Sequence, residues 1–233
     1  MTLINVISPH IDDSVFSLGS YMEQLRQSHE LAVINVFSIC TFAFGKLLPA
    51  TAANMTRKSE DHVALSHIGV RSVRYLDLPE ALLRGYRLED LSQFSGALAT
   101  DDDVITEATA RLRDLVVPGS VVFAPAGFGS HVDHLHVRLA CQGLDAILVY
   151  YADLPYAADR NRFDHAGAVE FTRTMQRQVI SVSHNLVEQH ISLCKYYESQ
   201  FEPSFADSMA GFLHLNHYIL WSHNEFATLD LNI

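Results

Sequence analysis

The chain has 233 residues, of which 48% are hydrophobic and 18% are charged, so it can bury one substantial core and is not intrinsically disordered. Its formal net charge of −11 argues against a nucleic-acid partner, because phosphate binding needs clustered Lys and Arg. No basic amphipathic stretch suggests a membrane surface, and no window approaches the roughly 20 apolar residues of a spanning helix.

Apolar runs typical of strands alternate with helical patterns along the chain. The first strand is expected at 3–8, and a helix with apolar residues at helical spacing is expected at 14–28. Further strands are expected at 31–39, 73–78, 121–126 and 146–151, and further helices at 55–68, 101–116, 132–143, 163–177 and 186–200. This alternation predicts a Rossmann-like, doubly wound α/β fold, with a mainly parallel sheet sandwiched by helices.

No internal repeat or linker divides the chain, so we expect a single domain over residues 1–233. Its core would span about 3–201. The C-terminal segment 202–233 is harder to interpret and would cover the active site or form a contact in a homo-oligomer. Three widely spaced cysteines without a CxxC pair, and an N-terminus without a signal-peptide pattern, predict reduced thiols and a cytoplasmic location.

Two short polar motifs each follow a predicted strand. They are Ser8-Pro9-His10-Ile11-Asp12-Asp13 and His131-Val132-Asp133-His134. Because ligands collect at the carboxyl ends of the strands in an open parallel sheet, the two loops are expected to meet there. Two imidazoles and one carboxylate, from His10, Asp13 and His134, form the ligand set of a hydrolytic zinc site with one position open. The same set would also suit Fe²⁺.

The other polar residues of the motifs have plausible chemical tasks. Asp12 would take a proton from a water activated by the metal, which makes it the candidate general base. His131 would hydrogen-bond a developing oxyanion or protonate a leaving amine. Asp133 would be the carboxylate partner of a histidine and fix its tautomer. Either motif alone is more often a helix cap with a surface histidine; finding both after predicted strands favours the metal site.

These motifs resemble the PIG-L (LmbE-like) family of metal-dependent de-N-acetylases. The family's Pro-His-Pro-Asp-Asp-Glu turn corresponds to residues 9–14, and its His-x-Asp-His motif to residues 131–134. Its Arg-x-x-Glu helix ending in Leu-Gly-Val corresponds to residues 57–70, a Tyr-Glu-Asp-x-Pro-Tyr stretch to 150–156, and its Lys…Tyr-x-Ser-Gln helix to 195–200. The resemblance therefore covers about residues 3–201.

The resemblance implies the same metal ligands, with Asp12 as the base, His131 as the group that stabilises the tetrahedral intermediate, and Asp133 as its tuner. It also implies that Arg57 contacts the substrate, although Arg57 could equally be a charge on a helix surface. Tyr151 and Asp153 could contact sugar hydroxyls or simply pack in the core. Ser14 replaces the family's glutamate, so one carboxylate near the metal is lost, although a serine can still cap backbone donors.

The expected function is a zinc-dependent hydrolase that removes an N-acetyl group from an amino-sugar conjugate of the N-acetylglucosamine type. The Tyr-rich stretch at 150–156 favours a role in antibiotic biosynthesis. Two alternatives remain open. One is an amidase for a non-sugar or thiol-conjugate amide, and the other is a non-catalytic relative that binds sugar or metal, although such a binder needs neither Asp12 nor His131. A nucleotide-binding protein is rejected, because no Gly-x-Gly-x-x-Gly turn follows the first strand.

Overall fold

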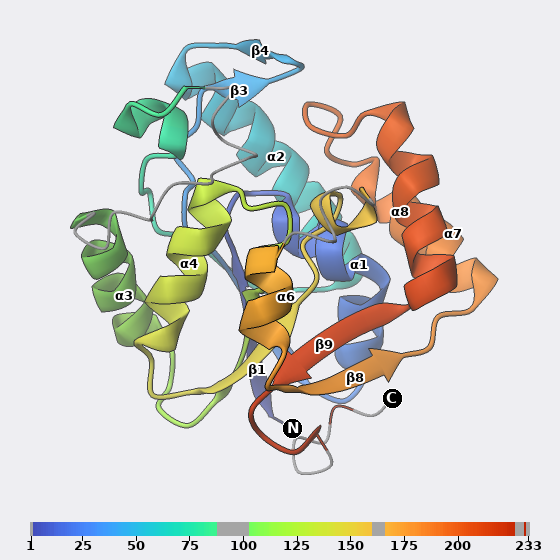
Figure 1. The fold of residues 1–233 in the computed structure, drawn as a ribbon. Coiled ribbons are helices and arrows are strands. Elements are labelled where there is room, and N and C mark those ends of the chain that lie inside the picture. Colours follow the sequence, from blue (N-terminus) through green and yellow to red (C-terminus); the bar gives the residue numbers. More distant parts are fainter. Residues whose placement is uncertain (1, 88–102, 160–165, 227–230, 232–233) are drawn as a thin grey trace.

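The computed structural model describes residues 2–87, 103–159, 166–226 and 231, and its centre is a seven-stranded sheet (Figure 1). In spatial order the strands are β5 (Ser72–Tyr75), β2 (Glu30–Asn35), β1 (Leu3–Ser8), β6 (Val121–Pro125), β7 (Ile147–Tyr151), β9 (Tyr218–Ser222) and β8 (Gln176–Ile180). The first five strands are parallel, β9 pairs antiparallel with β7, and β8 pairs antiparallel with β9. The expected mainly parallel α/β sheet is therefore confirmed.

Strand β1 is the central strand on which the site depends. It pairs in parallel with β2 on one edge and with β6 on the other, so that Val6 lies opposite both Val33 and Phe123. The chain winds outward from β1 through β2 to β5, and then returns to β6 and continues through β7. The loops after β1 and β6 therefore diverge at the topological switch point of the sheet, where α/β proteins place their ligands.

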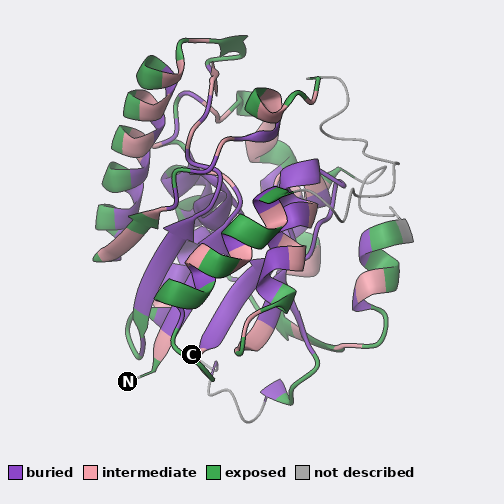
Figure 2. Cartoon of the chain, turned by 90° about the vertical axis from the view of Figure 1, so that its left-hand side faces the viewer, coloured by how far each residue is buried: buried purple, intermediate pink, exposed green. Residues whose placement is uncertain are grey.

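Helices cover both faces of the sheet (Figure 1). They are α1 (Asp13–Leu25), α2 (Ala50–Ile68), α3 (Asp103–Leu115), α4 (Val132–Gln142), α6 (Ala166–Thr172), α7 (His184–Cys194) and α8 (Pro203–Asn216). Helix α1 contacts α2 and α7, whereas α3 contacts α4. Figure 2 shows the buried sheet between helices whose outer faces are exposed. None of the described helices is long and apolar enough to span a membrane.

The structure corrects two helix predictions. Instead of one helix over 163–177, a short α6 is followed by the edge strand β8, whose exposed polar positions carry no periodic signal. The residues between the strand expected at 31–39 and the helix expected at 55–68 hold the hairpin of β3 (Phe42–Ala43) and β4 (Lys46–Leu47) and the first turn of α2, which begins at Ala50 directly after Pro49. Residues 101 and 102 of the expected cap of α3 lie outside the described residues.

The C-terminal segment completes the sheet. It supplies α8 and then β9, which inserts between β7 and β8.

Gly69 ends α2 at φ 87°, the left-handed conformation expected for a helix stop. All three cysteines are buried and free, as the sequence predicts.

Candidate active site

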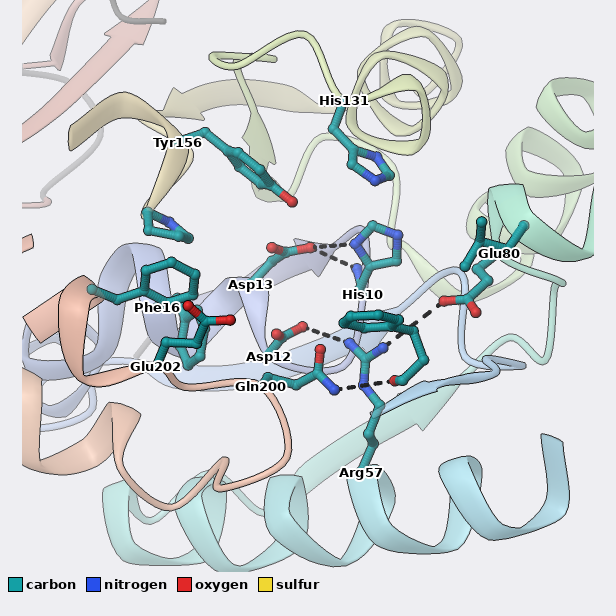
Figure 3. Close-up of a pocket in the computed structure, with 14 residues that line it drawn as sticks. His10, Asp12, Asp13, Phe16, Arg57, Glu80, His131, Tyr156, Gln200 and Glu202 are labelled. Atoms are coloured by element: carbon teal, nitrogen blue, oxygen red, sulfur yellow. Dashed lines mark hydrogen bonds and ion pairs between the residues drawn. The ribbon is translucent and has the colours of Figure 1, made fainter. Parts of the chain in front are cut away.

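A pocket of about 290 Å³ lies at the switch point of the sheet (Figure 3). The loop after β1 and the start of α1 supply its floor, and the loop between β6 and α4 supplies one wall. Its central polar lining residues are His10, Asp12, Asp13, Arg57, Glu80 and His131. Its aromatic lining residues are Phe16, Phe42, Tyr156 and Phe205. The two sequence motifs therefore meet, as expected from the ends of neighbouring parallel strands.

His10, Asp13 and His134 bring their side-chain atoms to one point. Asp13 Oδ2 lies 3.1 Å from His10 Nδ1 and 3.2 Å from His134 Nε2, and one candidate ligand atom from each residue lies within 4.8 Å of the others. His134 Nε2 is buried and has no hydrogen-bond partner among the described residues. A buried imidazole nitrogen without a donor partner, aimed at a carboxylate, fits a divalent metal ion.

In each candidate histidine ligand, the ring nitrogen opposite the candidate ligand atom contacts a buried carboxylate. His10 Nε2 lies 2.9 Å from Asp133 Oδ2, and His134 Nδ1 lies 2.7 Å from Asp153 Oδ1. Since a carboxylate only accepts, each of these nitrogens donates a proton. Once the opposite nitrogen has lost its proton, the lone pair of His10 Nδ1 or His134 Nε2 faces the proposed ion. Carboxylate partners of this kind orient metal-binding histidines and make them better ligands.

The charges around the histidines favour a cation. Burial lowers the pKa of His10, but hydrogen bonds to Asp13 and Asp133 outweigh it and raise the pKa to about 9. Burial also lowers the pKa of His134, and the nearby charge of Asp13 with the hydrogen bond to Asp153 raises it to about 10. The position between these residues therefore stabilises positive charge, which in the loaded protein a metal ion would supply.

Asp12 lies beside this cluster and faces the pocket. It accepts a 2.8 Å hydrogen bond from Arg57 Nη2, and the other terminal nitrogen of Arg57 lies 3.9 Å from Glu80 Oε2. Burial raises the pKa of Asp12 above its usual range, while the positive charge of Arg57 acts in the opposite direction. A carboxylate that is fixed in place and has a raised pKa has the properties of a general base.

His131 is held in one tautomer by the helix that it caps. Its Nδ1 accepts a 3.1 Å hydrogen bond from the backbone N–H of Asp133 at the start of α4, so the proton of the neutral ring resides on Nε2. Burial, together with the charge of His10, holds the pKa of His131 well below its usual range. His131 therefore presents a neutral N–H donor at the pocket.

The structure places three of the expected residues differently. Tyr151 is fully buried and donates to the carbonyl of Ile7. Asp153 is also fully buried, where it holds His134, so neither side chain lines the pocket and substrate contact by them is not supported. Asp133 was expected to tune His131, but its carboxylate hydrogen-bonds His10. Arg57 is not a surface charge, since its side chain is 4% exposed and lines the pocket.

The Ser14 hydroxyl does not cap a backbone donor among the described residues. It is buried without a hydrogen-bond partner among these residues, whereas the backbone N–H of Ser14 donates to Ser8 Oγ at 2.9 Å. Ser8 therefore supplies a side-chain oxygen to the first turn of α1.

Sequence reasoning missed residues that come from other parts of the chain. The short helix η1 (Ala81–Arg84) holds Asp133 from both ends: the N–H of Ala81 donates to Oδ2 at 3.0 Å, and Arg84 Nη2 donates to Oδ1 at 2.7 Å. Gln200 and Glu202, between α7 and α8, line the pocket. Helix η1 carries no periodic or motif signal. Gln200 ends the stretch that resembles the family's Lys…Tyr-x-Ser-Gln helix, but that resemblance gives it no role in the site.

Comparison with known proteins agrees with this geometry. The profile of the PIG-L family, described as GlcNAc-PI de-N-acetylase, matches residues 5–143. A 2′-N-acetylparomamine deacetylase from Streptomyces fradiae is 29% identical over 170 residues, which cover 68% of this chain and 59% of that protein's length. This chain therefore matches less than two thirds of that relative.

Solved structures share the fold. A deacetylase–teicoplanin complex from the biosynthesis pathway of teicoplanin has a TM-score of 0.75 at 22% identity, with 95% of this chain and 98% of that chain covered. The N,N′-diacetylchitobiose deacetylase from Pyrococcus horikoshii has a TM-score of 0.57 at 16% identity, with 92% and 76% covered. At these identities the similarity shows a common architecture.

Proposed function

Since the chain belongs to the PIG-L family, described as GlcNAc-PI de-N-acetylase, we propose that it is a metal-dependent de-N-acetylase acting on an N-acetylated amino-sugar conjugate. The observation that carries this proposal is the convergence of His10, Asp13 and His134 beside Asp12 in one pocket. A pure binding protein would need the three ligands but not a positioned base next to them. The names of the Streptomyces relative and of the teicoplanin-pathway structure support a substrate among the intermediates of amino-sugar antibiotics.

We assign the metal site to His10, Asp13 and His134, with Zn²⁺ as the expected ion and Fe²⁺ as the alternative. When bound, such an ion supplies Lewis acidity for the amide carbonyl and lowers the pKa of nearby water. The remaining chemistry belongs to side chains of this chain.

Asp12 removes a proton from the attacking water, because its carboxylate faces the pocket next to Asp13 and is held there by Arg57. His131 donates its Nε2–H to the oxygen that becomes negative when the amide carbonyl is attacked, since Nδ1 is already used by the backbone. The C–N bond then breaks, and the proton held by Asp12 passes to the departing amine. The products are acetate and the free amino sugar.

The test measures amine release from N-acetylglucosamine and a set of its conjugates by the metal-loaded protein. Asp12→Ala is compared with Asp114→Ala, a control at an exposed aspartate of α3, and the metal content of each is determined. We expect Asp12→Ala to retain metal but to lose about 10²–10⁴-fold in kcat, the usual contribution of a general base. The absence of amine release from every acetylated sugar by the metal-loaded wild-type protein would overturn the proposal.

A further inference from the structure

We propose that the pocket selects amino-sugar conjugates that carry a second, protonated amine, and that Glu202 is the residue that recognises this ammonium group. The inference rests on the proposed deacetylase function and specifies its substrate class. It predicts discrimination against conjugates in which a phosphate or carboxylate lies next to the acetylated sugar.

The cationic side chain of the pocket is already neutralised. Among the described residues that line it, Arg57 is the only lysine or arginine. Its guanidinium donates to Asp12 at 2.8 Å and lies 3.9 Å from Glu80. Its side chain is 4% exposed. An incoming anion would therefore have to compete with two carboxylates for a buried guanidinium, which is unfavourable.

The charges of the pocket leave an excess of carboxylates. Its described lining includes Asp12, Asp13, Glu80 and Glu202. A divalent ion and Arg57 together provide three positive charges against these four negative ones. The acidic net charge of −11 for the whole chain adds to the same field.

The negative charge without a compensating partner in the pocket is that of Glu202. Figure 3 shows Glu80 and Glu202 on opposite walls, with the His10–Asp13 pair and Asp12 between them. Glu80 is buried, and its Oε1 accepts from the backbone N–H of Thr41 at 2.6 Å and from the hydroxyl of the same residue at 3.0 Å. Glu202, in contrast, is exposed at the rim, and the structure shows no hydrogen bond or ion pair for its carboxylate among the described residues.

The neighbouring Gln200 also favours a donor ligand. Its Nε2 donates to the carbonyl oxygens of Phe42 at 3.1 Å and of Ser199 at 3.0 Å. Since a primary amide has two N–H groups, both are used, and only its carbonyl oxygen remains for a ligand. The wall formed by Gln200 and Glu202 therefore offers acceptors to a group that can donate, as an ammonium does.

The test uses three glycosides of N-acetylglucosamine that differ only in the charge of a short aglycone: 2-aminoethyl, 2-hydroxyethyl and carboxymethyl. We expect kcat/KM to fall in that order, with about tenfold between the first and the last at low ionic strength. The difference should lie mainly in KM. It should shrink in 0.5 M NaCl, because salt screens the interaction between exposed charges.

Glu202→Gln should reduce the preference for the aminoethyl over the hydroxyethyl glycoside by a few-fold. The matched control Glu170→Gln, at an exposed glutamate of α6 outside the pocket, should retain the wild-type preference. If all three glycosides are deacetylated at equal rates, or the carboxymethyl glycoside is preferred, the inference is wrong while the deacetylase function stands. If none is deacetylated, the proposed function itself fails, and the inference falls with it.

Discussion

Asp153 Oδ1 lies 2.7 Å from His134 Nδ1, and this buried contact determines which nitrogen of His134 faces the other candidate ligands. The second oxygen of Asp153 accepts from the backbone N–H groups of Gly127 and Phe128 at 2.7 and 2.9 Å. Gly127 has φ 87°, a left-handed conformation that glycine adopts without strain and other residues rarely adopt. The end of β7 and the loop after β6 are thus joined behind the candidate metal site.

Replacing Asp153 should weaken metal binding without removing a ligand. In Asp153→Asn, the side chain no longer offers two acceptor oxygens, so the orientation and basicity of His134 are lost. We expect metal affinity to fall about 10–100-fold, as measured by competition with a chromophoric chelator. Asp114→Asn, at an exposed position of α3, is the control. Equal affinities of the two variants would show that Asp153 has no part in holding the ligand.

Metal affinity should rise with pH. In the metal-free protein the pKa values of His10 and His134 are about 9 and 10, so metal binding at neutral pH must displace their protons. Apparent affinity should therefore increase by up to about 100-fold per pH unit below about pH 9, by about tenfold between pH 9 and 10, and then level off. Calorimetry in buffers of different ionisation enthalpy measures the released protons directly. Binding at pH 7 without proton release would contradict this prediction.

The same shifts predict the pH dependence of stability without metal. The folded-state pKa values of His10 and His134 lie above the ordinary value of 6.5, so the folded state binds these protons more tightly than the unfolded state does. Their contribution is complete below pH 6.5 and is lost as pH rises through 9 and 10. Urea unfolding in the presence of a chelator should show stability falling over this range. Saturating metal should restore it, because metal binds the folded state. A flat profile without metal would argue against charged histidines.

Arg84 should be important for stability as well as for the site. Its guanidinium pairs with the fully buried Asp133, which in turn holds His10. Arg84→Met leaves that buried carboxylate without its arginine partner, which we expect to lower the free energy of unfolding by about 3–5 kcal/mol. Arg113→Met, which removes an exposed donor to the carbonyl of Gly143, should cost less than about 1 kcal/mol. Similar losses in urea unfolding for the two variants would contradict the role given to Arg84.

The part of the site that is local in sequence was predictable, and the part that depends on packing was not. His10, Asp13 and His134 follow buried apolar strands within a few residues, and parallel strands bring their carboxyl ends to one edge. The sequence leaves Asp153 open between a sugar contact and core packing, because only the packing of β7 beside β6 shows that it lies behind His134. Arg84 reaches Asp133 across 49 positions from an irregular region without periodicity.

The fold, too, was predictable where the signal is local in sequence and was missed where it depends on packing. The five parallel strands were predicted from continuous apolar runs such as that of β2, which are typical of strands buried on both faces. Strand β8 was missed because it is an edge strand with mostly polar, exposed positions. Its pairing with β9 joins segments about 40 residues apart, which no local pattern reports.

The central claim is that a metal held by His10, Asp13 and His134 is required for amide hydrolysis. The most direct measurement is a titration of chelator-treated protein with Zn²⁺, continued past one equivalent, while amine release from an N-acetylglucosamine glycoside is followed. We expect almost no release without metal and a linear rise that ends at one ion per chain, and we expect His134→Ala neither to bind the ion tightly nor to recover activity. Full activity in the metal-free protein, or recovery of His134→Ala equal to that of the wild type, would contradict this claim.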